Sequence, residues 1–408
     1  MPTEGPAPGG GLRVAVVGPT QPYKGGVAAH TTELAHRLAA AGHDTVLVGW
    51  ERLYPHRLYP GEPTLPPGAS DLPPYPRTVP ALRWDRPGTW WRTGARLRGT
   101  DVVVVVFVIP AQVPALLALV RSIRAGAGRG PAAAGGGAGA RAPRVVVLAH
   151  NVVPHEQHPG GEWLTSRLLA AADTVLVHSA ALAEQAVAHG AGSVLVADLP
   201  PHLPGGVPEL APARGEGQGP DDGRAPGPTR VLALGMVREY KGFDLLLEAA
   251  AQVPDVEVTV AGEQWGRAGE RLRAVAADPR LAGRVRLEDG YVPGERVAAL
   301  AAAHDVLALP YRHGTASQNV LLARAHRMPV LVSTAGTLAD TVTDGVDGLV
   351  VPPGDVAALA TALRELARPE RLAALRAEVP PVDLDGPWRR YLETLLHDPA
   401  TLHQEVGR

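Results

Sequence analysis

The chain has 408 residues, of which 45% are hydrophobic, 4% aromatic and 20% charged, and its formal net charge is -2. This length predicts about two or three folded domains, and the small net charge argues against a nucleic-acid binder, which would carry a basic stripe. The absence of cysteine excludes disulfides and thiolate metal sites. Residues 1–11 are rich in Gly and Pro and lack the pattern of a secretory signal, so we expect a cytoplasmic location and leave peripheral membrane contact open.

The first half of the chain alternates apolar strands with helical stretches. A strand predicted at Leu12–Val17 leads through a loop rich in Pro and Gly, Gly18–Gly26, into a helix predicted at Val27–Ala41. Continuous apolar strands separated by helices are typical of a parallel sheet covered on both faces. Further strands in this half are expected at Thr45–Val48, Asp101–Val108, Arg144–Leu148, Thr174–Val177 and Ser193–Val196.

One apolar stretch imitates a membrane span. Val102–Val120 contains no charged residue, but Pro110 and Pro114 interrupt it and its first part, Val102–Val108, is largely β-branched. A short apolar run bounded by proline is typical of a buried parallel strand. We therefore predict a strand here and not a membrane-spanning helix.

The second half repeats the opening of the first half. A strand at Arg230–Gly235 leads through a glycine-containing loop into a helix at Gly242–Gln252, and both halves thus open as strand, Tyr-Lys-Gly loop and helix. The other elements expected here are strands at Val256–Ala261, Val285–Glu288, Val306–Leu309, Pro329–Ser333 and Gly348–Val351, and helices at Ser317–His326 and Val356–Ala367.

This repetition predicts an α/β protein with two Rossmann-like, doubly wound domains facing a cleft. We place the domains at residues 1–202 and 230–386, with a linker rich in Pro and Gly at 203–229 and a helical tail at 387–408. In such sheets, ligands bind beyond the carboxyl ends of the strands. Both Tyr-Lys-Gly loops should lie at that edge.

The chain has only two lysines, Lys24 and Lys241, against 37 arginines, and both precede a glycine in these loops. Lysine offers a compact ammonium where arginine offers a planar fork, so the pair predicts bound anions, most simply phosphates. The second loop combines three sources of positive potential: Arg238, Lys241 and the start of the following helix. Together they predict a binding site for a diphosphate. Two surface cations that bind nothing remain the alternative.

A histidine follows the predicted strand at Arg144–Leu148. His150 would lie at the carboxyl end of that strand, where it can donate to a sugar hydroxyl or a phosphate, or exchange protons near neutral pH. A purely structural histidine is the alternative; a metal site with His155 is disfavoured, because no second cluster of ligands is visible. The loop at Gly18–Gly26 matches neither the dinucleotide nor the Walker pattern, which disfavours nicotinamide and ATP chemistry.

Three segments carry a family resemblance. They read Gly-Pro-Thr-Gln-Pro-Tyr-Lys-Gly-Gly at 18–26, His-Asn-Val-Val-Pro-His-Glu at 150–156 and Arg-Glu-Tyr-Lys-Gly at 238–242. Together and in this order they resemble retaining glycosyltransferases of the two-Rossmann-domain (GT-B) type, in family 4, also described as glycosyltransferase group 1. The resemblance implies transfer of a sugar from a nucleotide-diphosphate donor to an acceptor hydroxyl, with no metal or other cofactor required.

The resemblance also assigns the residues. The first domain would bind the acceptor (a small molecule, a glycan or a lipid-linked compound), and the second would bind the nucleotide sugar. Glu51–Arg98 and Pro131–Pro143 would be variable loops that shape the acceptor site, with Tyr54–Pro76 as a candidate lid. The implied roles are donor diphosphate binding and catalysis for Arg238 and Lys241, contact with the phosphates and acceptor for Gly25 and Gly26, proximity to the transferred sugar for the catalytic His150, and contact with the base or ribose for Glu263, Tyr291 and Val292.

The chain departs from the family at one place. Family 4 usually carries two glutamates eight positions apart, and here Gly314 and Leu322 stand there. Ser317, Gln318 and Asn319 lie between them and can supply hydroxyl, amide and backbone N–H contacts to the donor instead. The departure favours one alternative, a non-catalytic GT-B-fold subunit that binds a partner. A nucleotide-sugar epimerase of the same fold is a separate alternative.

Overall fold

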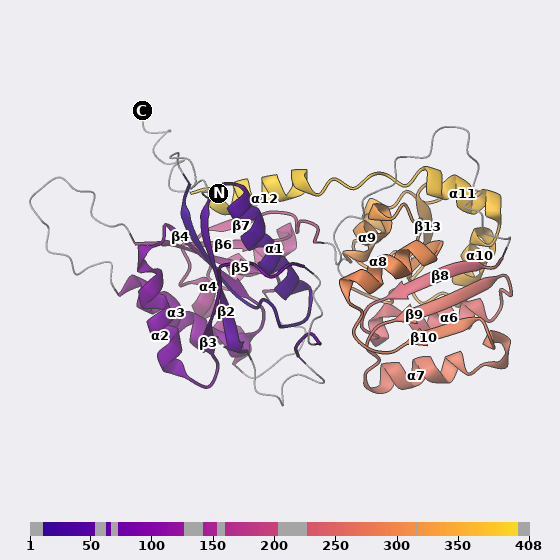
Figure 1. Ribbon diagram of the computed structural model, residues 1–408, viewed down its shortest axis with the longest axis horizontal. Coiled ribbons are helices and arrows are strands. Elements are labelled where there is room, and N and C mark those ends of the chain that lie inside the picture. The colour runs from indigo at the N-terminus through magenta and orange to yellow at the C-terminus, as the bar shows by residue number, and fades with distance from the viewer. Residues whose placement is uncertain are drawn as a thin grey trace, which may run out of the picture. The chain divides into compact units, whose positions relative to one another are not determined.

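The chain divides into two units in the computed structural model, which describes residues 11–53, 63–66, 72–125, 142–152, 160–202, 227–314 and 317–398. Unit 1 comprises Met1–Leu65, Pro73–Pro200 and Leu384–Arg408, and unit 2 comprises Pro66–Leu72 and Pro201–Asp383 (Figure 1). Most of the linker expected at 203–229, of the loop at Pro131–Pro143 and of the lid at Tyr54–Pro76 lies outside the described residues.

Unit 1 is built on a seven-stranded sheet in the order β3-β2-β1-β4-β5-β6-β7. All of its strand pairs are parallel, and β1 lies between β2 and β4, with Val14 beside Thr45 on one side and Val102 on the other. The strands are β1 (Arg13–Val17), β2 (Asp44–Arg52), β3 (Thr78–Arg83), β4 (Val102–Phe107), β5 (Arg144–Ala149), β6 (Thr174–Val177) and β7 (Val194–Val196).

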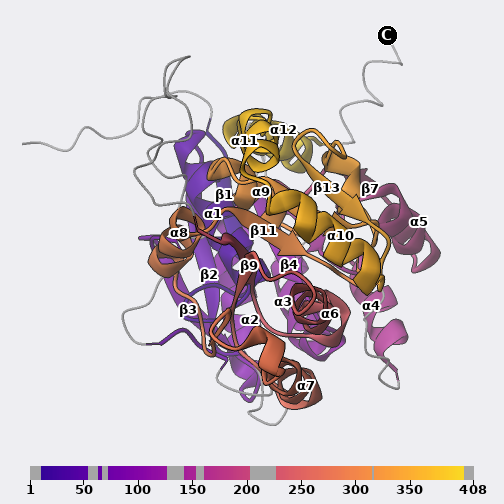
Figure 2. The same ribbon diagram turned by 90° about the vertical axis from the view of Figure 1, so that its right-hand side faces the viewer.

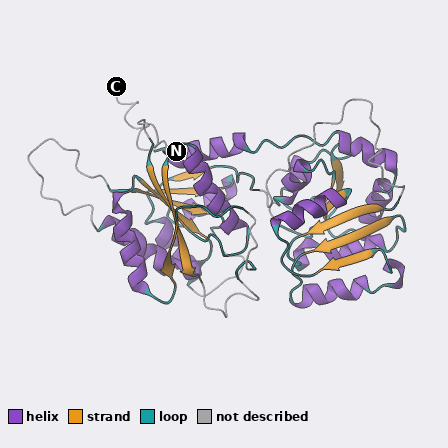
Figure 3. Ribbon diagram, in the orientation of Figure 1, coloured by secondary structure: helices purple, strands orange, loops and turns teal. Residues whose placement is uncertain are grey.

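Helices cover both faces of this sheet (Figure 3). The helices of unit 1 are α1 (Gly26–Ala40), α2 (Pro87–Arg96), α3 (Val113–Arg124), α4 (Gly161–Leu169), α5 (Ala180–Ala188) and α12 (Asp385–Leu396). The last of these, α12, returns from the end of the chain and packs with α1 in the same apolar cluster as one face of the sheet.

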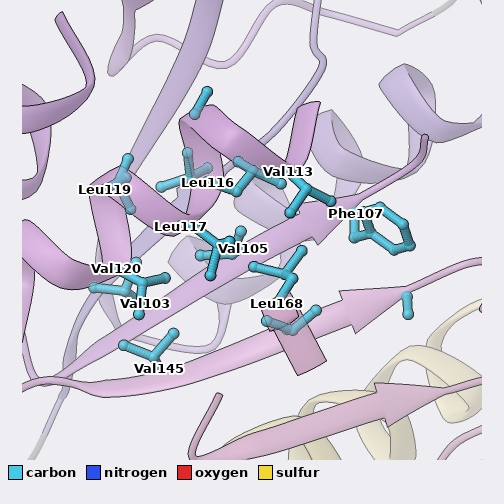
Figure 4. Packing of buried hydrophobic residues seen from close by; sticks show 14 of the residues in the cluster. Val103, Val105, Phe107, Val113, Leu116, Leu117, Leu119, Val120, Val145 and Leu168 are labelled. Carbon is cyan, nitrogen blue, oxygen red and sulfur yellow. The ribbon is translucent and has the colours of Figure 1, made fainter. Parts of the chain in front are cut away.

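Strand β4 shows why the sequence forms this layered arrangement. Its alternate residues Val103 and Val105 belong to the cluster that includes Leu116 of α3, as Figure 4 shows. The intervening Val104 belongs to the opposite cluster, with Leu34 of α1. A strand buried on both faces needs the continuous apolar run seen in the sequence.

No helix in the described part of the chain is long and apolar enough to cross a membrane.

Unit 2 is built on a six-stranded parallel sheet in the order β10-β9-β8-β11-β12-β13. Figure 2 shows α6 beside α7 and α10 in this unit. The strands are β8 (Thr229–Leu234), β9 (Val256–Ala261), β10 (Val285–Glu288), β11 (Val306–Leu309), β12 (Val330–Ser333) and β13 (Gly348–Val351). The helices are α6 (Phe243–Ala250), α7 (Gly266–Ala276), α8 (Gly294–Ala303), α9 (Asn319–Ala325), α10 (Val356–Leu366) and α11 (Pro369–Ala377).

The strand order reverses once in each sheet, between β1 and β4 in unit 1 and between β8 and β11 in unit 2. At such a switch point the loops that follow two neighbouring strands leave in opposite directions and open a crevice for ligands. The loop after β1 contains Gly25, and the loop after β8 contains Arg238 and Lys241. The fold therefore brings both predicted glycine loops to switch points.

The strands predicted in the sequence are confirmed, several of them residue for residue. The prediction of variable loops throughout Glu51–Arg98 is wrong, because this segment contains the end of β2, the edge strand β3 and helix α2. The sequence of β3, Thr-Val-Pro-Ala-Leu-Arg, includes a proline, and only its last two residues are buried. An edge strand of this kind lacks the apolar run by which the buried strands were predicted.

Candidate functional site

The turn after β8 carries the two predicted donor-binding cations. It runs through Gly235 into a short 3-10 helix, η4 (Glu239–Lys241), and then through Gly242 into α6. Gly242 has a φ of 65°, and a Cβ atom there would lie 2.1 Å from the carbonyl oxygen of Pro310, at the end of β11. Only glycine combines this left-handed backbone with so close an approach, so the sequence Lys-Gly fixes Lys241 against the β8–β11 switch point.

Polar contacts with the loop after β11 hold this turn in place. The backbone N–H of Arg312 donates to the carbonyl oxygen of Tyr240 (2.6 Å), and its guanidinium forks the carboxylate of Asp244 in α6 (2.8 and 2.7 Å). Burial acts to raise the pKa of Asp244, but the hydrogen bonds and charge of Arg312 outweigh it, and the pKa is lowered. The ring of Tyr240 also meets Tyr311 edge to face at 5.6 Å. The position of Lys241 is thus set by its neighbours on both sides.

The two cations of the turn carry uncompensated charge. Neither Lys241 nor Arg238 has a carboxylate or hydrogen-bond partner for its side chain among the described residues. Lys241 Nζ lies 5.8 Å from the ring centres of Phe243 and Tyr311. Burial, together with the charge of Arg238, lowers the pKa of Lys241 to about 8. Two like charges held without counter-ions form a site that an anion would stabilise.

The segment that replaces the usual glutamate pair lies next to this turn. Asn319, the first residue of α9, donates from Nδ2 to the carbonyl oxygen of Leu234 at the end of β8 (2.9 Å). The hydroxyl of Ser317 lies 3.3 Å from that of Tyr311, and Oε1 of Gln318 is buried with no hydrogen-bond partner in the described part of the chain. One N–H of the Asn319 side chain therefore joins α9 to the end of β8, a contact that the sequence did not reveal.

The two positions of the missing glutamates differ in their surroundings. Leu322 is only 1% exposed and belongs to the core, where a carboxylate would need a buried partner. Gly314 is exposed and has a φ of 150°. The apolar environment around Leu322 accounts for the leucine at this position.

The loops after β9 and β10 complete one edge of the sheet of unit 2. The backbone N–H of Val237 donates to the carbonyl oxygen of Glu263 (2.8 Å), which joins the β8 and β9 loops. Tyr291 and Val292 follow β10 and are partly buried. Since β10, β9, β8 and β11 are neighbours in the sheet, the fold brings all of the predicted donor-binding residues of unit 2 to its carboxyl edge.

The glycine loop of unit 1 is braced by side chains. Gly25 precedes α1 with a φ of 106°, a conformation that favours glycine, and a Cβ atom there would meet nothing within 4 Å. The hydroxyl of Tyr23 donates to the carbonyl oxygen of Glu51 (3.1 Å) and accepts from the N–H of Leu53 (2.9 Å). Gly25 and Gly26 are both exposed at the start of α1, so the loop offers accessible backbone at the β1–β4 switch point.

His150 directly follows β5 and contacts a histidine that the sequence analysis did not single out. His150 Nδ1 lies 3.1 Å from Nε2 of His178, and Nδ1 of His178 lies 3.1 Å from the carbonyl oxygen of Ala197. His178 stands directly after β6, as His150 stands after β5, and this shared position was the signal available in the sequence. His155 lies outside the described residues. Over the described ranges, no cluster of three or more His, Cys, Asp or Glu residues forms a metal site.

Comparisons with known proteins agree with this architecture. Residues 228–368 match the family model described as glycosyl transferases group 1. The GDP-mannose-dependent alpha-(1-6)-phosphatidylinositol monomannoside mannosyltransferase of Mycolicibacterium smegmatis is 34% identical over 157 residues, which cover 36% of this chain and 40% of that protein. The lipopolysaccharide core biosynthesis glycosyltransferase LpsE of Rhizobium meliloti is 29% identical over 175 residues, 41% of this chain and 50% of that protein. The matches thus span half or less of these relatives' length.

Two solved structures cover nearly the whole chain. Sucrose-phosphate synthase from Thermosynechococcus elongatus has a TM-score of 0.62 and 19% identity, covering 97% of this chain and 99% of the other. Anabaena Alr3699/HepE, solved in complex with UDP and glucose, has a TM-score of 0.64 and 15% identity, covering 94% and 99%. These likenesses establish that the chain has the GT-B fold of two doubly wound α/β domains.

Proposed function

We propose that this protein is a glycosyltransferase that moves a sugar from a nucleotide-diphosphate donor to an acceptor hydroxyl. The observation that carries the proposal is the pair of uncompensated cations, Arg238 and Lys241, held at the β8–β11 switch point of unit 2. The family match at residues 228–368 includes this turn, and the relatives reported above are named as glycosyltransferases. A diphosphate is the substrate group that best fits two such charges.

The chemistry follows from where charge develops. Breaking the bond between the anomeric carbon and the donor phosphate leaves negative charge on the departing diphosphate, while the acceptor oxygen bonds to the same carbon. Cations fixed beside that diphosphate before the reaction stabilise the transition state more than the ground state. Lys241 and Arg238 would act in this way, because no carboxylate of the described residues competes for them.

The proposal extends to mechanism. The three segments that resemble family 4 favour retention at the anomeric carbon, with the leaving phosphate taking the acceptor proton. The two cations would supply the positive charge that a metal ion supplies in other transferases, so we expect activity without added metal. The same resemblance assigns Gly25 and Gly26 to the phosphates and the acceptor, and His150 to the transferred sugar. It assigns Glu263, Tyr291 and Val292 to the base or ribose.

The replacement of the usual glutamate pair by Gly314 and Leu322 favours one rival, a GT-B-fold subunit that binds a partner without transferring sugar. A product assay separates these readings. The protein is incubated with UDP-glucose or GDP-mannose and a panel of polyol, glycan and lipid-linked acceptors, and products are identified by mass spectrometry and their anomeric configuration by NMR. We expect a glycoside of retained configuration; epimerised donor, or no turnover of any donor, would contradict the proposal.

Substitution of the two lysines tests the site assignment. Lys241→Ala should lower the transfer rate by about 100-fold or more, the usual effect of removing a group that stabilises charge in the transition state. Lys24→Ala should have a smaller effect, because no second cation shares its loop. Steady-state rates on one donor measure both variants, and the reverse order would refute the assignment of Lys241 to the leaving group.

A further inference from the structure

A turn and a helix at one edge of unit 1 expose two tryptophans. Trp84 is the first residue after the edge strand β3, and Trp91 lies in α2, which begins at Pro87. Trp84 is 43% exposed and Trp91 is 48% exposed, although the whole chain contains only seven tryptophans. Large apolar side chains that are exposed close together indicate a surface that binds a partner.

The packing of α2 on α3 decides which of its faces is exposed. The two helices lie side by side (Figure 1), so close that a Cβ atom at Gly94 would lie 2.5 Å from the carbonyl oxygen of Leu119 in α3. The neighbouring Trp90 is half-buried, and its Nε1–H donates to the carbonyl oxygen of Arg83 (2.7 Å). The opposite face of α2, at the spacing of neighbours on one side of a helix, is exposed and consists of Trp91, Arg92, Ala95 and Arg96.

The same surface carries positive charge that no carboxylate of the described residues neutralises. Arg86, Arg92 and Arg96 are exposed and form no ion pair over the described ranges. The one acidic side chain of β3, α2 and their connection is Asp85, which is already paired with Arg83 (3.0 Å). Three unpaired guanidinium groups beside two exposed tryptophans indicate a partner that is anionic and also partly apolar.

Hydrogen bonds join this surface to the glycine loop of unit 1. Arg83, which precedes Trp84, donates to Oε1 of Glu51 in β2 (2.9 Å). The hydroxyl of Tyr23, in the glycine loop, donates to the carbonyl oxygen of the same Glu51 (3.1 Å). Since β1, β2 and β3 are parallel neighbours, Trp84 and the glycine loop follow the same edge of the sheet. A partner bound at Trp84 therefore lies on the side of unit 1 where this loop is exposed.

We propose that Trp84, Arg86, Trp91, Arg92 and Arg96, together the Trp–Arg surface, dock unit 1 on an anionic membrane. Tryptophan rings bind at the level of the lipid headgroups, where one part of the ring is in an apolar environment and the N–H is in water. Arginines are attracted to anionic lipids. A neutral glycan is disfavoured as the partner, because recognition of its hydroxyl groups needs side-chain acceptors and a guanidinium group only donates.

Sedimentation with lipid vesicles tests the proposal without any sugar transfer. We expect the native protein to bind vesicles made of equal parts phosphatidylcholine and phosphatidylglycerol, more weakly as salt is added, and to bind pure phosphatidylcholine vesicles far less. Replacing the three arginines of the surface by glutamine should weaken binding by about 100-fold, since each arginine near an anionic membrane strengthens it by about fivefold. The control makes the same change at three exposed arginines of unit 2, Arg267, Arg364 and Arg368, and should bind nearly as the native protein does.

The tryptophans distinguish membrane docking from attraction by charge alone. Trp84→Ala and Trp91→Ala leave the net charge unchanged, and each should weaken binding to the mixed vesicles by about tenfold through loss of buried apolar area, with circular dichroism confirming that the variants are folded. The proposal would be overturned if the native protein did not bind the mixed vesicles, if the arginine variant bound as the control does, or if both tryptophan variants bound as the native protein does. Binding to the acidic polysaccharide alginate but not to vesicles would also overturn it. None of these results depends on the proposed function.

Discussion

Replacing Lys241 by methionine should make the free protein more stable. Burial and the nearby charge of Arg238 lower the pKa of Lys241 from 10.5 to about 8, a difference that corresponds to about 3 kcal/mol of unfavourable free energy for the charged side chain. Since Lys241 is only partly buried, solvent screening makes this an upper value. Methionine has similar length, carries no charge and packs well beside the rings of Phe243 and Tyr311.

The gain in stability from Lys241→Met should decrease as pH rises. At pH 7, Lys241 is protonated in the folded and the unfolded protein, so the native protein carries the full unfavourable free energy of the buried charge. Between pH 8 and 10.5 the folded protein releases this proton before the unfolded chain does, so the free energy of unfolding of the native sequence rises with pH. The advantage of Lys241→Met should therefore be largest below pH 8 and disappear above about pH 10.5.

Urea denaturation followed by circular dichroism at pH 7.0 and pH 10.5 measures the free energy of unfolding of both proteins. A gain of up to about 3 kcal/mol for Lys241→Met at pH 7.0 corresponds to roughly 6–12 °C in Tm for a unit of this size. Lys24→Met is the control: we expect no gain from it, because Lys24 has an interaction partner in the structure. A Lys241→Met protein that is less stable than the native sequence at pH 7.0, or a gain that persists unchanged at pH 10.5, would refute the reasoning.

Three further changes should have distinct effects. Gly242→Ala should lower the free energy of unfolding by about 2 kcal/mol or more, because the new Cβ would lie 2.1 Å from the Pro310 oxygen at a φ of 65°. The control Gly354→Ala, at a φ of 78° with no atom within 4 Å of the new Cβ, should lower it by only about 1–2 kcal/mol. Equal losses for the two variants in urea denaturation would be inconsistent with the predicted clash at Gly242. Trp388→Ala should cost about 3–5 kcal/mol by the same method, since this side chain is 1% exposed, and a neutral result would show that α12 does not stabilise unit 1. The affinity of the native protein for a nucleoside diphosphate should weaken as pH rises past about 8, where Lys241 loses its charge, whereas the affinity of Lys241→Arg should stay level from pH 7 to 9. Calorimetric titration measures both proteins, and parallel pH profiles would show that Lys241 is not involved in binding.

The sheets could be predicted from the sequence because buried parallel strands require continuous apolar runs. Val256–Ala261 was located residue for residue in this way. The edge strand β3 escaped because most of its residues are exposed or half-buried, so burial leaves little pattern in them. The place of Lys241 in the chain was also predictable, because an apolar strand pattern at Arg230–Gly235 precedes it and a helical pattern begins at Gly242, as β8 and α6 confirm.

The site contacts that depend on strand order were beyond the sequence. His150 and His178 are far apart in the chain, and only the order β5-β6-β7 places them and Ala197 in a row. A second role of Asn319 was also beyond the sequence: its Nδ2 donates to the Leu234 carbonyl oxygen, while its predicted contact with the donor stays a prediction. A side chain that satisfies a strand-end carbonyl cannot be told from a ligand-binding one until the neighbouring strand is known.

The central claim is that unit 2 binds a nucleotide diphosphate through Lys241 and Arg238. Isothermal titration calorimetry of the native protein with UDP and GDP at pH 7.0 tests it most directly, with Lys241→Met and Arg238→Met titrated beside it. We expect at least one nucleoside diphosphate to bind the native protein and its Kd to rise by about tenfold or more in each variant, as loss of a charge-assisted hydrogen bond predicts. The claim would be contradicted if neither diphosphate bound at millimolar concentration, or if all three proteins bound it equally well.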